Sequence, residues 1–154
     1  MKPLDTSIRD VLIDAINSEV ASRAYYLALA ERAADAAAQR KLIDLAQRQV
    51  LHRNALEDRF RKLVGEEPPP PAEPSVEIPD DLRDIDTARA LRIALEHERE
   101  SESNFRFLSE RAADPQLLRL FGELAEMEWK HKAEIQAEYD ALRSKDDPES
   151  LLFE

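Results

Sequence analysis

The sequence has no cysteine and only two glycines among its 154 residues. Without cysteine the chain can form no disulfide, no thiolate metal site and no cysteine nucleophile. A β-sheet protein needs turn residues at short intervals, and two glycines do not supply them. Alanine, leucine, glutamate and arginine are abundant instead. This composition predicts an all-α fold.

Long apolar runs are also missing, so no segment is predicted to span a membrane and no signal peptide is recognised at the N-terminus. We therefore expect a cytoplasmic protein with no membrane partner. The formal net charge is −11, and no basic stripe offsets it. Because this charge repels phosphate groups, we expect no nucleic-acid partner.

Apolar residues recur at helical spacing in four segments, which predict helices over residues 7 to about 33, 36–64, 87 to about 112 and 115 to about 143. Ser7, Asp35 and Asp114 are the expected N-caps, and Gly65 is the expected C-cap. Residues 144–154 are left as a C-terminal tail. The helices pair into two hairpins, 7–64 and 87–143.

Between the hairpins lies a proline-rich segment, residues 65–86, which holds six of the nine prolines. In a polyproline-like conformation its 22 residues would reach roughly 65 Å, further than the roughly 42 Å of the preceding helix. It is therefore predicted to return along a helix, with Val76 and Ile78 fixing it to the hairpin. A flexible interdomain linker is the alternative, but a lone helix pair makes a poor domain. We expect one four-helix bundle domain over residues 1–154.

The two hairpins are sequence repeats at an offset of 79 residues. Glu31–Asp35 (ERAAD) is identical to residues 110–114, and Glu19 falls on Glu98 and His52 on His131. Twelve of the 34 positions from 19 to 52 match without a gap. Each hairpin thus carries a glutamate on its first helix and, 33 residues later, a histidine on its second.

These polar residues fall within the apolar stripes of their helices. Packing two such hairpins about a pseudo-two-fold axis would bring Glu19, His52, Glu98, Glu128 and His131 to one level of the core. Burying several carboxylates together is costly unless cations neutralise them. A glutamate from each of two helices, with Glu-x-x-His from the others, is the ligand set of di-iron carboxylate bundles.

With these residues the chain resembles the ferritin-like superfamily, and within it the rubrerythrin-like proteins. The resemblance implies that Glu19 and Glu98 are single-carboxylate ligands, and that Glu128 and His131 are the Glu-x-x-His pair of the fourth helix. It also implies two bound iron ions. Carboxylate and imidazole ligands accept zinc and manganese as well.

The second helix departs from the family pattern. Its segment LAQRQVLH keeps His52 but places Gln49 where the family has a glutamate that commonly bridges the two metals. Gln49 is retained as a weak, uncharged candidate ligand, which leaves three carboxylates instead of four. Glu102, one turn after Glu98, is a candidate substitute, although its repeat mate is Arg23.

Three functions are compatible with this pattern. The first is a di-iron oxidoreductase that reduces peroxide or oxidises Fe²⁺; lacking the cysteine-ligated iron domain of rubrerythrins proper, it would need an external electron donor. The second is a non-catalytic iron- or zinc-binding protein. The third is a helical scaffold with a relic metal site that acts through Trp129 or the tail. Trp129 lies off the core stripe, where it is either an exposed contact of a homodimer or higher homo-oligomer, which we expect, or a side chain packed under the crossover.

Overall fold

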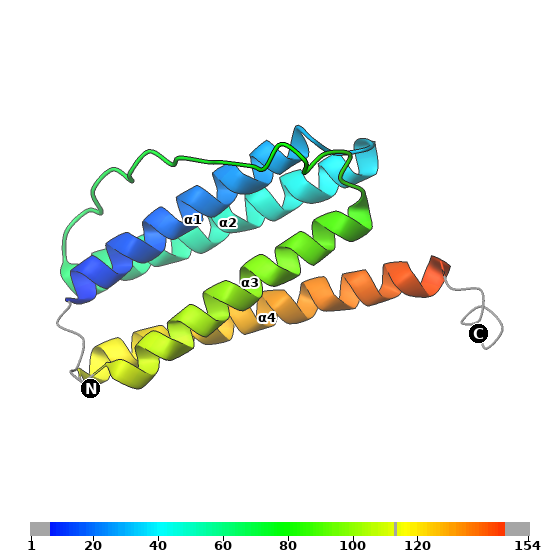
Figure 1. Ribbon diagram of the computed structural model, residues 1–154. Helices are drawn as coiled ribbons and strands as arrows, with labels where there is room; N and C mark the ends of the chain where they lie inside the picture. Colours follow the sequence, from blue (N-terminus) through cyan, green and yellow to red (C-terminus); the bar gives the residue numbers. More distant parts are fainter. Residues whose placement is uncertain (1–6, 113, 147–154) are drawn as a thin grey trace. The chain divides into compact units, whose positions relative to one another are not determined.

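A computed structural model describes residues 7–112 and 114–146 of the chain. In this described part there are four helices, α1 (Ile8–Ala30), α2 (Ala36–Val64), α3 (Thr87–Arg111) and α4 (Pro115–Asp146) (Figure 1). The described residues form two compact units, one of α1, α2 and the proline-rich segment, the other of α3 and α4. The predicted all-α class of repeated hairpins joined by a long crossover is confirmed. The single-domain assignment stays a prediction.

Helix α1 begins where its capping residue predicts. The Ser7 hydroxyl accepts a hydrogen bond from the Asp10 amide at 3.1 Å, and satisfies one of the unpaired donors of the first turn. The helix ends at Ala30, three residues before the predicted end. Ala33 instead forms an isolated parallel bridge with Ile85 at the end of the proline-rich segment. This pairing takes the backbone of residues 32–34 out of the helix.

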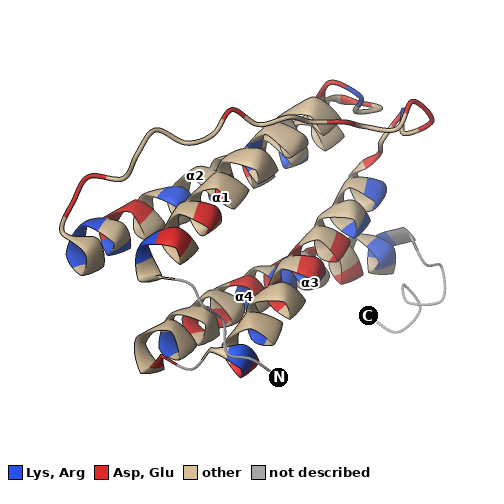
Figure 2. Ribbon diagram, turned by 60° about the vertical axis from the view of Figure 1, so that its left-hand side comes forward, with Lys and Arg blue, Asp and Glu red and all other residues tan. Residues whose placement is uncertain are grey.

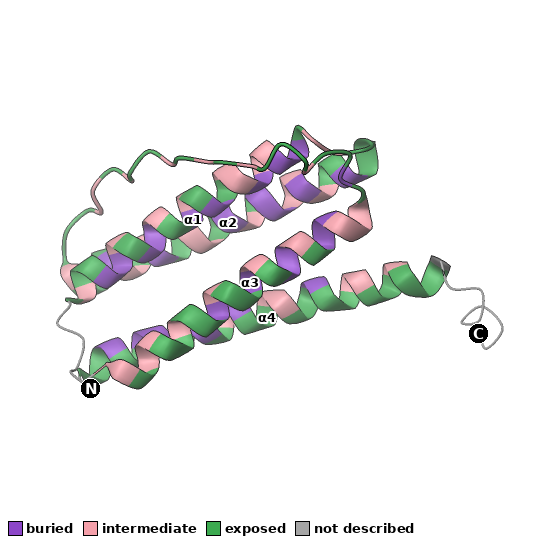
Figure 3. Cartoon of the chain, in the orientation of Figure 1, coloured by how far each residue is buried: buried purple, intermediate pink, exposed green. Residues whose placement is uncertain are grey.

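Helix α2 has the predicted bounds. The Asp35 carboxylate accepts a hydrogen bond from the Ala38 amide at 2.9 Å at the N-terminus. Gly65 closes the C-terminus with φ of 81°, a left-handed conformation that glycine adopts without steric cost. Buried residues of α1 and α2 recur along one side of each helix (Figure 3).

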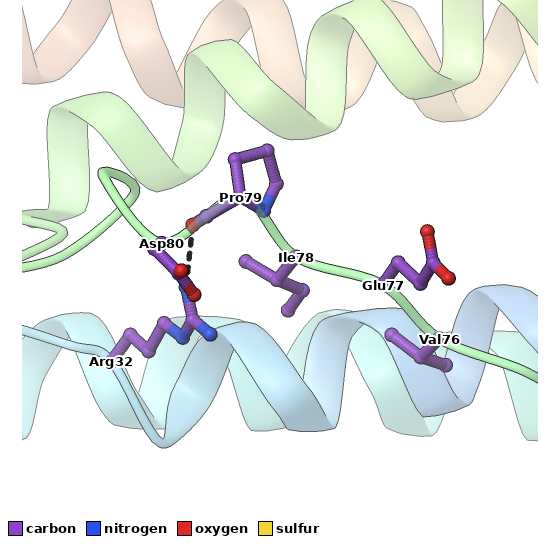
Figure 4. Close-up of a pocket in the computed structure, with 6 residues that line it drawn as sticks. All are labelled: Arg32, Val76, Glu77, Ile78, Pro79 and Asp80. Carbon is purple, nitrogen blue, oxygen red and sulfur yellow. Dashed lines mark hydrogen bonds between the residues drawn. The ribbon is translucent and has the colours of Figure 1, made fainter.

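The proline-rich segment, which we call the crossover (residues 65–86), returns alongside α1 and α2 (Figure 1). Near its start, the Ala72 amide donates to Asn17 Oδ1 at 3.0 Å. Near its end, the Arg32 guanidinium donates to the carbonyl oxygen of Pro79 at 2.6 Å (Figure 4). It also donates to the carbonyl oxygen of Leu82 at 3.2 Å. The predicted return along a helix is therefore observed.

The predicted role of Val76 and Ile78 in fixing the crossover stays a prediction, and a further contact lies at Ile85. Val76 and Ile78 are only half-buried and line an open pocket beside Arg32 (Figure 4). Ile85 is fully buried, and its backbone exchanges hydrogen bonds with Arg32 and Ala34 at 3.0 and 2.8 Å. Ile85 thus combines a fully buried side chain with backbone pairing to the hairpin.

Helices α3 and α4 form the second hairpin. Asp114 Oδ1 accepts a hydrogen bond from the Gln116 amide at 2.8 Å, and Pro115 occupies the first helical position, as predicted. The Ser109 hydroxyl donates to the Leu118 carbonyl across the turn. Buried apolar side chains of the two helices are Ala90, Leu91, Ala94, Leu95, Leu117, Leu120, Phe121, Leu124, Ala125 and Ile135.

Helix α4 continues three residues past its predicted end. Residues 144–146, expected in the tail, are helical. Arg143 and Lys145 lie in this last turn, where positive charge interacts favourably with the helix dipole. The rest of the predicted tail lies outside the described residues. No helix in the described part is both long and apolar enough to cross a membrane.

Candidate metal centre

The α3–α4 hairpin brings Glu98, Glu128 and His131 together. One ligand atom from each side chain lies within 4.8 Å of the other two. Both carboxylates are buried, with only 3% of each residue exposed, and the imidazole is partly buried. We call these three residues the α3–α4 ligand set.

Helical spacing explains why these side chains meet. On α3, Glu98 lies one turn after Ala94 and Leu95, within the buried stripe. On α4, Glu128 and His131 lie three residues apart, and so project from the same side of the helix. The buried sides of α3 and α4 therefore bring three polar side chains into contact range. Each of them would be costly to bury without a partner.

The α1–α2 hairpin carries the repeat mates of this set. Glu19 Oε2 lies 3.6 Å from His52 Nδ1, and both side chains are largely buried. Gln49, one turn before His52, is 4% exposed. Glu19 Oε2 is a buried oxygen that accepts no hydrogen bond from any described residue. We call Glu19, Gln49 and His52 the α1–α2 ligand set.

Within each hairpin the structure thus places every residue of the predicted site on a buried or partly buried face. The donor chemistry of both sets suits a divalent cation, since carboxylates and imidazole bind iron, manganese and zinc. The Glu19 oxygen that lacks a hydrogen-bond donor also suits a cation. The sets differ in charge, because Gln49 occupies the position that Glu128 has in the repeat. Metal coordination by these six residues stays a prediction.

Glu102 and Lys132 are charged residues that follow Glu98 and His131 on their helices. Glu102, the candidate substitute carboxylate, is 8% exposed and outside the Glu98–Glu128–His131 cluster. It pairs with Lys132, whose Nζ lies 2.9 Å from Glu102 Oε1. Sequence reasoning missed Lys132, although its place directly after His131 and the charge of Glu102 in an apolar stripe were available signals.

Charge over the rest of the molecule is mixed. Acidic and basic residues both occur along the helices of each hairpin (Figure 2). Trp129 on α4 is 46% exposed, as predicted for the neighbour of buried Glu128. Such an exposed side chain is compatible with the predicted oligomer, which stays a prediction.

Comparisons with known proteins concern the fold and the family of the chain. No curated protein matches the sequence. A solved structure of a hypothetical protein from Pyrococcus furiosus is 26% identical, with a TM-score of 0.57 over 90% of this chain and 91% of that one. An uncharacterized conserved protein from Magnetospirillum magnetotacticum MS-1 is 22% identical, with a TM-score of 0.65 over 88% of this chain and 95% of that one, and shows the same fold.

The family comparison covers most of the chain. The Rubrerythrin family model matches residues 10–139, a range that includes all six residues of the two ligand sets. The chain therefore belongs to the rubrerythrin family of the ferritin-like superfamily.

Proposed function

We propose that the protein binds up to two metal ions per chain, one for each ligand set, and that iron is the functional metal. The observation that supports this most is the buried cluster of Glu98, Glu128 and His131, whose ligand atoms lie within 4.8 Å of one another. Two carboxylates and an imidazole at this spacing have little structural use without a cation between them. Membership of a family that usually binds metal supports the same conclusion.

The residues of the two ligand sets differ in the charge and in the ligand atom that they would contribute. Glu98 and Glu128 supply negative charge in a buried position, where it interacts strongly with a cation. His131 supplies a neutral nitrogen ligand. Glu19 and His52 supply one of each in the other hairpin, while Gln49 supplies at most an uncharged oxygen.

Bound iron would supply one-electron chemistry: two Fe²⁺ ions would give the two electrons that reduce hydrogen peroxide to water, and dioxygen or peroxide would be the oxidant in a ferroxidase reaction. These 154 residues contain no cysteine, so they hold no thiolate-bound iron to deliver electrons. Peroxide reduction would therefore draw electrons from an external donor. Because both ligand sets are buried, fewer water molecules would compete with their side chains for the metal ion.

A non-catalytic metal-binding protein is the second candidate, and Gln49 favours it. An amide ligand removes one negative charge from the α1–α2 set, which lowers its expected affinity for a second ion. Peroxide consumption by the iron-loaded protein in the presence of an added reductant, beyond the amount that the bound Fe²⁺ can reduce by itself, separates the two candidates. Stoichiometric metal binding without turnover would assign storage or transfer of the ion.

The metal assignment is tested by metal analysis of protein purified without chelator. We expect His131→Ala to lose at least half of the bound metal, because it removes a ligand of the carboxylate-rich set. His97→Ala is the matched control, since His97 lies on α3 outside both ligand sets and should leave the metal content unchanged. Equal metal content in His131→Ala and wild type would refute the assignment.

A further inference from the structure

One buried carboxylate in the described part lies outside both ligand sets. The buried polar and charged residues there are Glu19, Ser22, Gln49, Glu98, Glu102 and Glu128. Of the four carboxylates among them, Glu102 alone belongs to neither set. A glutamate is rarely buried to this degree unless a partner neutralises it.

Lys132 is that partner. Its Nζ lies 2.9 and 3.4 Å from the two carboxylate oxygens of Glu102. Arg106 approaches the same carboxylate at 3.8 Å, and is itself 4.0 Å from Glu126 on α4. Glu102 is therefore held mainly by one ammonium group, with a second cation further out.

The position of this ion pair places it next to the α3–α4 ligand set. Glu98 and Glu102 are four residues apart on α3, so their Cβ atoms are about 5–6 Å apart on the same face. Lys132 directly follows His131 on α4. Glu102 and Lys132 thus neighbour the ligand set along both helices, so a change of side-chain torsions is the motion by which Glu102 would exchange Lys132 for a cation.

The two members of the pair differ in how easily they can move. The Lys132 side chain is 26% exposed and the Glu102 side chain 10%. A lysine can keep its methylene stem against the protein and turn its ammonium into water. Glu102 has no such route, so if Lys132 moves away, its carboxylate keeps only the more distant Arg106 at 3.8 Å and can accept another cation.

The repeat shows that this pair is specific to one hairpin. At an offset of 79, Glu102 corresponds to Arg23 and Lys132 to Arg53. Arg53 pairs with Glu57 along its own helix, at 2.9 Å. The α1–α2 hairpin therefore has no counterpart of the Glu102 carboxylate, and it also lacks a carboxylate at Gln49.

We propose that Glu102 is a further ligand of the α3–α4 set, held by Lys132 in the metal-free protein and transferred to a divalent ion when one binds. The hairpin then offers three carboxylates and an imidazole to one ion, and fills before the α1–α2 set. This proposal rests on the proposed function, because it adds a ligand to the same site.

The test measures Zn²⁺ affinity of the full chain by competition with a chromogenic chelator. Glu102→Gln should lower the affinity for the first ion at least about tenfold. Even mutation of a residue that only hydrogen-bonds to a ligand lowers metal affinity roughly 10–100-fold. Lys132→Gln should raise this affinity, because metal binding no longer has to break the Glu102–Lys132 ion pair. Lys130→Gln is the matched control: it removes the same charge from an exposed position of α4 and should change little.

The double variant separates ligand release from simple charge repulsion. If Lys132 acts by holding Glu102, Lys132→Gln should have no effect on affinity in the Glu102→Gln background. An equal gain in both backgrounds would mean that Lys132 merely repels the ion, and would overturn the proposal. Trp129, the only tryptophan, follows Glu128 on α4 and reports filling of this hairpin by fluorescence quenching with Co²⁺.

Two outcomes distinguish this proposal from the function on which it rests. Wild-type Zn²⁺ affinity in Glu102→Gln overturns the Glu102 assignment and leaves metal binding intact. No Zn²⁺ binding by the wild type refutes both. Circular dichroism of every variant, and Glu102→Asp as a variant that keeps the carboxylate, control for loss of the fold. Lys132→Gln is an independent check, because its predicted effect on affinity has the opposite sign.

Discussion

Gln49 is the residue at which the two ligand sets differ most in charge. It is 4% exposed, so a substitution there changes the interior of the α1–α2 hairpin rather than its surface. Its amide is neutral, whereas its repeat mate Glu128 is a carboxylate. The difference of one charge is expected to decide which set binds its ion more weakly.

Gln49→Glu should reverse this difference. With Zn²⁺ present, the affinity for the weaker ion should rise about tenfold or more, because a charged ligand replaces a neutral one. Without metal, the added charge lies close to Glu19 and should lower the free energy of unfolding by about 1–3 kcal/mol. Calorimetric Zn²⁺ titration and thermal melts in chelator measure the two effects.

Gln47→Glu is the control for this variant, because Gln47 is exposed on the same helix and the change in net charge is the same. If both variants bind and melt alike, Gln49 does not take part in metal binding. The alignment of the two hairpins at α2 would then carry no functional meaning.

The buried or partly buried positions of the candidate ligands could be predicted because these residues follow two regular patterns, the helical period and the repeat. Glu98, Glu128 and His131 meet within one hairpin as those patterns indicate. Lys132 could not be predicted in the same way. Its contact with Glu102 depends on the rotation of α3 against α4, and periodicity along one helix does not fix that rotation.

At the scale of elements, local sequence signals predicted the helices well. Ser7, Asp35, Gly65 and Asp114 all cap helices as expected, since capping depends on residues three or four positions away. The crossover was predicted less well. Ile85 pairs with residues 32–34, which lie more than 50 positions earlier in the sequence, and no periodic pattern predicts such a contact.

Arg32 is expected to hold the end of the crossover in place. Arg32→Lys replaces a guanidinium that donates to both Pro79 and Leu82 with one ammonium group, and should cost about 1–2 kcal/mol of unfolding free energy. The Ile85 amide, which donates to the Arg32 carbonyl oxygen, should exchange its hydrogen faster. Urea denaturation and hydrogen exchange measure these effects.

Arg40→Lys on the exposed side of α2 provides the control, and should change neither quantity. Unchanged exchange at Ile85 in Arg32→Lys would show that the backbone pairing with the crossover stands without the guanidinium. The crossover would then depend on the burial of Ile85 rather than on Arg32.

At the scale of the whole molecule, the net charge of −11 provides two ways for a cation to act. One is specific binding at the buried ligand sets. The other is neutralisation of the acidic residues distributed over both hairpins (Figure 2). Any divalent cation can neutralise surface charge, but only a cation that accepts imidazole ligands suits sets that contain His52 and His131.

Zn²⁺ should therefore stabilise the protein far more than Mg²⁺ at the same concentration. At 100 times its dissociation constant, a bound ion adds about 2.7 kcal/mol to the free energy of unfolding. For a chain of this size that corresponds to a rise in Tm of roughly 5–10 °C. Mg²⁺ prefers oxygen ligands and keeps several of its waters, so it should give only the small rise expected from charge screening. Differential scanning calorimetry with each ion, reversed by chelator, tests this. Equal rises with Zn²⁺ and Mg²⁺ would show that the cation acts on surface charge and that the histidines do not take part.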